Sequence, residues 1–305
     1  MTWTVLATQA LNGLQYGVLL FLLAAGLTLV FGIMNFVNLA HGSLYMLGVY
    51  LGAEVYGTSG SFVLAGIAAV IGTVLIGVSI ERTLLVPFYT RDHLYQVFAT
   101  VGLILFFNEL ARIIWGSSAI YMRAPDGFRG AVDLFGIRYP SYRFLMIFVG
   151  LAVAVILYFV IHHTKIGMLT RAGATNLTMV SVLGINIKLL NTVLFGVGAA
   201  LAGLAGFMAA PILAVQPGMG DNVIITVLVV IVIGGIGSVR GAFFGALIIG
   251  VVDTLGRVYL PLILSQFTEK SFADAGGSAV ASMSIYLFMA AVLAVRPQGL
   301  FPVAR

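Results

Sequence analysis

Residues 14–33 read LQYGVLLFLLAAGLTLVFGI, a stretch of apolar and small residues without a single charged side chain. A bilayer core about 30 Å thick is crossed by about 20 apolar residues in a helix, so this stretch predicts a membrane-spanning helix. The rest of the chain extends the pattern, because 61% of its 305 residues are hydrophobic and 8% are charged. A soluble domain carries roughly 25% charged residues. We therefore expect most of the outer surface to contact lipid.

Further apolar stretches of similar length follow at 37–56, 61–80, 96–115, 144–161, 189–213, 223–239, 241–262 and 276–295. They predict an all-α fold, a polytopic transmembrane helical bundle with about eight or nine membrane segments. The stretch 37–56 contains polar residues, and the sequence leaves open whether it crosses fully or is broken or re-entrant. We assign the whole chain, 1–305, to one transmembrane domain. The segment Met1–Asn12 lacks the basic start of a signal peptide, so the first span is expected to be retained.

Positive charge predicts the orientation, because basic loops of membrane proteins face the cytoplasm. The linker Glu81–Tyr95, the loop His162–Lys188 and the tail Arg296–Arg305 contain Arg82, Arg91, Lys165, Arg171, Lys188, Arg296 and Arg305. This predicts a cytoplasmic loop at 163–188 and an external loop at 116–143. The signal is weak, since the external loop also carries Arg123, Arg129, Arg138 and Arg143. We attribute the formal charge of +5 to these loops and not to nucleic-acid binding.

The segment Gly26–Ser43, GLTLVFGIMNFVNLAHGS, combines glycines with polar side chains at membrane depth. Unpaired polar groups in hydrocarbon cost several kcal/mol, so these side chains either line a substrate path or hydrogen-bond to neighbouring helices. The glycines permit a broken helix, whose free backbone groups can meet a zwitterionic substrate. The sequence leaves both interpretations open. The candidate substrate-path residues are Asn35, Asn38, His41 and Ser43.

Residues 165–188 form the longest loop expected in the cytoplasm. Leu177, Val180 and Leu183 recur at helical spacing, and Gly184 follows as a stop signal. This predicts a short helix at the membrane surface with one apolar face. That face either packs into a groove of a partner protein or rests on lipid headgroups, and the spacing does not separate the two.

Small residues at four-residue spacing predict close helix packing. They are Gly198, Ala202 and Gly206 in one stretch and Gly241 and Gly245 in another. The second pair belongs to Gly234–Gly245, in which Arg240 stands where a dinucleotide-binding fingerprint requires its last glycine. We interpret this run as a tight turn between two helices.

The ionisable residues of the expected spans are few. Glu109 with Arg112, and Asp253 with Arg257, have the spacing of ion pairs on one helix face. Glu54 is left as the unpaired carboxylate that an ion-driven transporter would need. The chain has no cysteine, no metal-binding motif and no G-x-x-x-x-G-K-[ST] phosphate loop. We therefore expect no metal site, no bound cofactor and no enzymatic activity in this chain.

Four segments together resemble the LivH-type permease family of branched-chain amino acid ABC transporters: Gly26–Gly48, Arg171–Ile185, Gly234–Gly245 and Arg296–Pro302. They occur in the family's order, and NLAHG at 38–42 and RPQGLF at 296–301 are the most specific. The resemblance implies a subunit of a bacterial inner-membrane importer that moves branched-chain amino acids, or a related small polar solute, by ATP-driven alternating access. An importer of urea, amides or aromatic acids and an ion-gradient-driven secondary transporter remain alternatives.

The resemblance also implies partners: a second, related permease, a periplasmic solute-binding protein and two ABC ATPase subunits that bind ATP and magnesium. By similarity, the stretch 171–184 matches the coupling helix that sits in an ATPase groove. The residues given this role are Arg171, Leu177, Val180, Leu183 and Gly184. One departure is that no acidic residue lies between Lys165 and Lys188, which bears on which ATPase fits.

Overall fold

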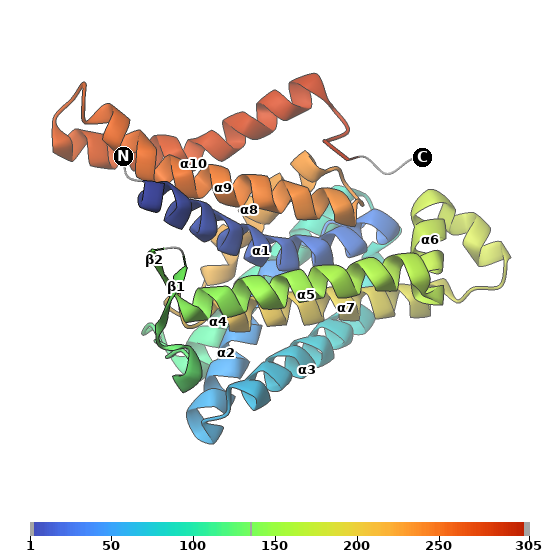
Figure 1. Cartoon of the computed structure of the whole chain (residues 1–305). Coiled ribbons are helices and arrows are strands. Elements are labelled where there is room, and N and C mark those ends of the chain that lie inside the picture. The colour runs from blue at the N-terminus through green and yellow to red at the C-terminus, as the bar shows by residue number, and fades with distance from the viewer. Residues whose placement is uncertain (1–2, 135, 302–305) are drawn as a thin grey trace.

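The computed structural model describes residues 3–134 and 136–301, so Pro302 and Arg305 of the C-terminal segment and Met1 lie outside the described residues. The chain folds into a helical bundle (Figure 1). Its helices are α1 (Trp3–Met34), α2 (His41–Ser59), α3 (Phe62–Ile80), α4 (His93–Trp115), α5 (Ser141–His163), α6 (Lys165–Val182), α7 (Ile187–Ala209), α8 (Met219–Gly234), α9 (Val239–Leu264) and α10 (Lys270–Val295).

Seven helical segments of the described chain are long and apolar enough to cross a membrane, and α2 and α8 are shorter or less apolar. Counted together, these nine segments agree with the expected eight or nine. The helix ends follow ordinary capping rules: the hydroxyl of Ser61 accepts from Leu64 N at the start of α3, and that of Ser238 accepts from Gly241 N at the start of α9. Gly184, with φ of 82°, follows the end of α6, as the sequence predicts.

Helix α1 runs through the centre of the bundle and is almost fully enclosed between Val18 and Ala25. It packs against α5, α7 and α9 (Figure 1). The approach to α9 is close, because a Cβ atom at Gly17 would lie 2.8 Å from Ala246 O. Without a hydrophobic drive between helices in lipid, such close backbone packing is what holds membrane helices together.

The two small-residue faces lie at helix contacts of this kind. On α7, Gly198 faces Gly26 of α1, and Gly206 lies so close to Tyr45 O of α2 that any side chain would overlap it. Ala202, between them, is fully buried. On α9, Gly241 and Gly245 pack against the end of α8, and a Cβ atom at Gly245 would lie 2.8 Å from Val230 O. Within the run 234–245, residues 235–238 form a tight turn between α8 and α9, and residues 239–245 begin α9.

Two helices begin in the interior of the bundle. His41, the first residue of α2, lies beside Gly26, eight residues or about 12 Å before the end of α1. The start of α8 meets the start of α2, since a Cβ atom at Gly42 would lie 2.5 Å from Gly220 O. The chain is non-helical before both starts, at 35–40 and 210–218. The sequence left open whether the stretch 37–56 is broken; the structure places an interruption at 35–40 and a continuous helix α2 after it, and the second interruption, before α8, was not predicted.

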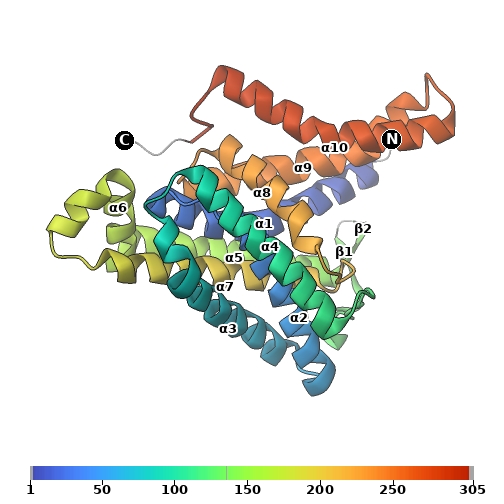
Figure 2. The ribbon, with the colours of Figure 1, turned by 180° about the vertical axis from the view of Figure 1, so that it is seen from behind.

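The two broken pairs run in opposite directions. Helices α1 and α8 run towards the end of the bundle that carries α6, whereas α2 and α7 run away from that end (Figure 2). The crossings between the pairs are reciprocal: Gly26 faces the Gly198 backbone and Gly198 faces the Gly26 backbone, and Gly42 and Gly220 face each other likewise.

Two connecting segments differ from expectation. The linker after α3 is not a free loop, because Glu81–Leu85 continues the helix as a π-helical turn and Val86–Phe88 adds a 3-10 turn. The external loop contains a short antiparallel hairpin of β1 (Ala131–Leu134) and β2 (Ile137–Pro140). Its residues alternate over too few positions for the sequence to reveal two strands.

Candidate functional site

The starts of α2 and α8 bring polar residues into the middle of the bundle. Asn38, His41 and Ser43 are each about 1% exposed. Among the described residues, the Asn38 amide, His41 Nε2 and the Ser43 hydroxyl have no hydrogen-bond partner. Most buried polar groups in proteins are paired, so a group of unpaired ones indicates a site that water or a ligand completes.

Asn35 does not belong to this group. Its side chain is exposed, and its backbone φ of 48° is positive. Its N–H donates to Phe31 O at 3.0 Å, which ends α1 in the manner of an asparagine cap. The structure thus separates Asn35 from the other three candidate path residues and gives it a local role at the helix end.

Two further polar residues lie beside the start of α8, and sequence analysis missed both. Asn108 Nδ2, on α4, donates to Asp221 Oδ2, in the first turn of α8, at 2.9 Å. The Asn108 Oδ1 atom is buried without a partner among the described residues. The two lie 113 positions apart, so spacing cannot connect them. Asp221 lies just before the apolar stretch 223–239. It enters the bundle because the chain is non-helical before α8 and α8 therefore starts in the interior.

The local electrostatics suit a zwitterion. The first turns of two helices carry a partial positive charge, and neither α2 nor α8 has a side-chain cap at its N-cap residue. The first turn of α2 contains no acidic residue and can attract a carboxylate, whereas Asp221 lies in the first turn of α8, offsets the partial charge there and can attract an ammonium group. In transporters built from interrupted helices, half-helix N-termini point at anionic substrate groups near the bilayer midplane.

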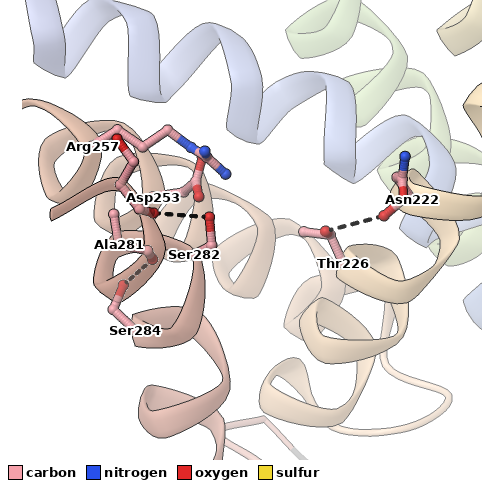
Figure 3. Close-up of polar contacts among 8 residues, drawn as sticks. Asn222, Thr226, Asp253, Arg257, Ala281, Ser282 and Ser284 are labelled. Carbon is pink, nitrogen blue, oxygen red and sulfur yellow. Dashed lines mark hydrogen bonds and ion pairs between the residues drawn. The ribbon is translucent and has the colours of Figure 1, made fainter. Parts of the chain in front are cut away.

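Three other carboxylates of the membrane helices have partners within the bundle. Arg112 Nη1 lies 3.0 Å from Glu109 Oε1, and Arg257 Nε lies 2.8 Å from Asp253 Oδ2, so both predicted ion pairs are present. The second pair lies where α9 meets α10, near Ser282 and Ser284 (Figure 3). Figure 3 also shows Asn222 and Thr226 on α8, at some distance from this pair. Glu54, expected to be unpaired, accepts from Trp115 Nε1 at 3.3 Å.

Glu81 is a buried carboxylate that the sequence placed in a loop. It is about 1% exposed and accepts from Tyr89 Oη at 2.7 Å and from Thr192 Oγ1 at 2.9 Å. Burial, together with the hydrogen bond to this carboxylate, raises the pKa of Tyr89 far above its usual value. Through these contacts, the segment 81–89, which follows α3, is held against α7.

Helix α6 occupies the loop expected to contact an ATPase. It is kinked at Asn176, whose Oδ1 accepts from Met179 N at 2.9 Å and caps the second half. Leu177 and Val180 pack towards the bundle, but Leu183 is 75% exposed, so the three do not share one buried face. Leu183 follows the last helical residue, where the helical spacing no longer holds.

The end of α6 presents an exposed apolar tip, formed by Met179, Val182 and Leu183. Arg171, in the first half of the helix, donates to the carbonyl of Ile161 at the end of α5. Met179 and Val182 were not singled out from the sequence, because they have the same three-residue spacing as Leu177 and Val180 but lie on a different face of the helix.

A helical membrane bundle whose helices break around an enclosed polar centre has the architecture of a solute-transport protein. The family described as "Branched-chain amino acid transport system / permease component" matches residues 9–295, and this chain belongs to it.

Characterised relatives are similar over most of the chain. The high-affinity branched-chain amino acid transport system permease protein LivH of Salmonella typhimurium is 31% identical over 267 residues, which cover 83% of this chain and 86% of the relative. The corresponding protein BraD of Pseudomonas aeruginosa is 32% identical, covering 81% of this chain and 85% of the relative. The ribose import permease protein RbsC of Escherichia coli is 25% identical over 76% of this chain and 72% of the relative. No solved structure matches.

Proposed function

We propose that this chain, a permease subunit of an ABC importer, carries branched-chain amino acids across the bacterial inner membrane. The observation that carries the proposal is the meeting of α2 and α8 beside unpaired buried polar groups. We propose that Asn38, His41 and Ser43 line the path when the bundle opens. Asp221, held by Asn108 at 2.9 Å in the first turn of α8, then faces the ammonium group, and the start of α2 faces the carboxylate.

The energy for transport enters through partners in this proposal. Two ATPase subunits bind ATP and magnesium at the end of the bundle that carries α6, which we place in the cytoplasm. A second, related permease completes the path, and a periplasmic protein delivers the solute. The exposed tip of α6, Met179 to Leu183, docks into an ATPase groove, as an amphipathic helix does in a partner's groove.

The assembly is tested by purifying the tagged chain gently from native membranes and identifying what accompanies it by mass spectrometry. ABC ATPase subunits and a related permease are expected. The purified assembly is then placed in proteoliposomes, and uptake of labelled leucine is measured with and without ATP. Uptake that proceeds without ATP and follows an ion gradient would refute the proposal in favour of a secondary transporter.

The coupling role of α6 is tested by Leu183→Glu. Because Leu183 is 75% exposed, this change is expected to leave the fold intact while it abolishes ATP-driven uptake and weakens ATPase association. Val180→Glu is the structural counterpart, since Val180 is 4% exposed and a buried charge should destabilise α6 itself. Normal ATPase association of the Leu183→Glu protein would place the docking surface elsewhere.

A further inference from the structure

A wide groove lies on the side of the bundle where α1 is framed by α5 and α9 (Figure 1). Its volume is about 1020 Å³. The floor is α1, the walls are α5 and α9, and one end is closed by α6 and by the turn before α9. The polar centre at the starts of α2 and α8 contributes none of its residues to this groove. The groove is therefore a separate feature with its own chemistry.

The groove is apolar along most of its length and basic at one end. Its walls include Leu151, Val155 and Phe159 of α5 and Phe243 and Phe244 of α9. The basic side chains Arg171, Arg240 and His162 lie at the α6 end. The α1 floor extends from Phe21 to Ile33, which is about 18 Å of helix. Half of a bilayer core is about 15 Å thick, so the groove has the length of one leaflet.

The positive charge at this end is not neutralised by the protein. No acidic residue lines the groove, and neither Arg171 nor Arg240 forms an ion pair within the described chain. Arg171 is held by the carbonyl of Ile161. The acidic residues of this end of the bundle are Glu81 and Asp92, and Glu81 is buried against Tyr89 and Thr192. The two guanidinium groups therefore remain available to an anion.

We propose that this groove binds an anionic phospholipid of the leaflet at the α6 end. One acyl chain lies along α1 between α5 and α9, and the phosphate contacts Arg240 and Arg171. Basic pockets between membrane helices on the cytoplasmic side are known to hold anionic headgroups. A neutral phospholipid can cover the apolar walls but leaves both arginines without an anionic partner. A purely apolar helix of another subunit would also cover the walls and leave both arginines unpaired. Charge complementarity thus selects the anionic lipid.

The test uses the assembled transporter in nanodiscs of phosphatidylcholine with a small fraction of phosphatidylglycerol. A photoreactive phosphatidylglycerol, with the reactive group in its acyl chain, is cross-linked and the labelled peptides are identified by mass spectrometry. Labels are expected on α1, α5 and α9. Competition by unlabelled lipids gives the preference for phosphatidylglycerol over phosphatidylcholine.

Three variants make the test specific. Arg240→Gln is expected to lower the preference about fivefold, because one basic side chain near the lipid surface contributes about 1 kcal/mol. Ala154→Trp, which fills the groove, is expected to abolish the labelling of α5. Arg82→Gln is the matched control, an exposed cation of the same end outside the groove, and is expected to leave both readouts unchanged.

Two outcomes would overturn the proposal. In the first, labelling shows no preference for the anionic lipid, or Arg240→Gln and Arg82→Gln change it equally. In the second, another subunit fills the groove. Because the chain contains no cysteine, a Val155→Cys variant carries one unique attachment point for a cross-linker. Efficient cross-linking of that cysteine to the second permease, with no lipid label in the groove, would assign the groove to a subunit interface.

Discussion

Replacing Asn38 by leucine separates a transport role from a structural one. Asn38 is 1% exposed, and neither its Nδ2 nor its Oδ1 has a partner within the described chain. Leaving a buried polar group unpaired costs about 1–3 kcal/mol, whereas an apolar side chain of similar size carries no such cost. We expect Asn38→Leu to raise the free energy of unfolding by about 2 kcal/mol, roughly a 30-fold change in the equilibrium constant. We expect the same change to suppress uptake.

Gln96→Leu is the matched control, because Gln96 is a buried amide whose partners are all present. Its Oε1 accepts from Val37 N at 3.1 Å, and its Nε2 donates to Phe88 O at 3.3 Å and to Arg91 O at 3.1 Å. Removing it takes this partner from Val37 N and Arg91 O, while Phe88 O keeps its hydrogen bond from Arg91 N, so the free energy of unfolding is expected to fall by about 3 kcal/mol. The two amides should therefore respond to the same substitution with opposite signs.

The assay is equilibrium unfolding in detergent, followed by tryptophan fluorescence. The chain has two tryptophans, and Trp3→Phe leaves Trp115 as the reporter. Trp115 stacks on Tyr50 with 4.6 Å between ring centroids, so it reports on the contact between α2 and α4. A loss of stability in Asn38→Leu would mean that the amide binds neighbouring helices, and normal uptake would remove Asn38 from the path.

Three further changes follow from the packing and the buried charges. Gly206→Ala is expected to lower the free energy of unfolding by about 1–3 kcal/mol, because the added Cβ overlaps Tyr45 O. Gly102→Ala is the control, since Gly102 faces open space on α4, and it should raise the free energy of unfolding by about 0.5–1 kcal/mol. Equal melting temperatures of the two variants would refute the packing role of Gly206. Arg257→Ala should lower the free energy of unfolding by about 2 kcal/mol more than Asp253→Ala does, because it leaves the Asp253 carboxylate, whose side chain is only 9% exposed, without its partner. Thermal unfolding of both variants tests this difference. Glu81→Leu should release the segment after α3 and speed its cleavage in limited proteolysis relative to Arg82→Leu, and equal cleavage would contradict the anchoring role.

Much of the fold could be predicted from the sequence, because a long run of apolar residues indicates a membrane-spanning helix. Both i,i+3 and i,i+4 ion pairs and the turn at Gly234–Gly245 were predictable, since each depends on local spacing. The burial of Glu81 was not, because a π-helical turn and contacts with distant residues carry it inside. A hydropathy pattern assigns a charged residue that directly follows a membrane span to the next loop.

The candidate site was only half visible for a related reason. Asn38, His41 and Ser43 lie within one short polar segment, so composition reveals them together. Asn108 and Asp221 belong to two helices that meet only in the folded bundle. Nothing in the sequence around 210–218 states that α8 starts in the interior, because its glycine and prolines describe an ordinary loop equally well. The exposed tip of α6 escaped notice since periodicity identifies buried faces better than free ones.

The reciprocal glycine contacts have a consequence for the barrier between conformations. At Gly26 with Gly198, and at Gly42 with Gly220, the nearest contacts join backbone to backbone, and the side chains of Val30 and Ile224 pack beside them. Rotating α1–α2 against α7–α8 therefore moves mainly backbone past backbone at these two crossings, whereas at the contact between α2 and α7 it must also move the Phe207 ring, which lies against Gly52. Since the pairs are oppositely oriented, a tilt that widens one mouth of the bundle narrows the other. One rigid-body movement can then exchange the two openings, and the close contacts between α2 and α7 contribute to its activation cost.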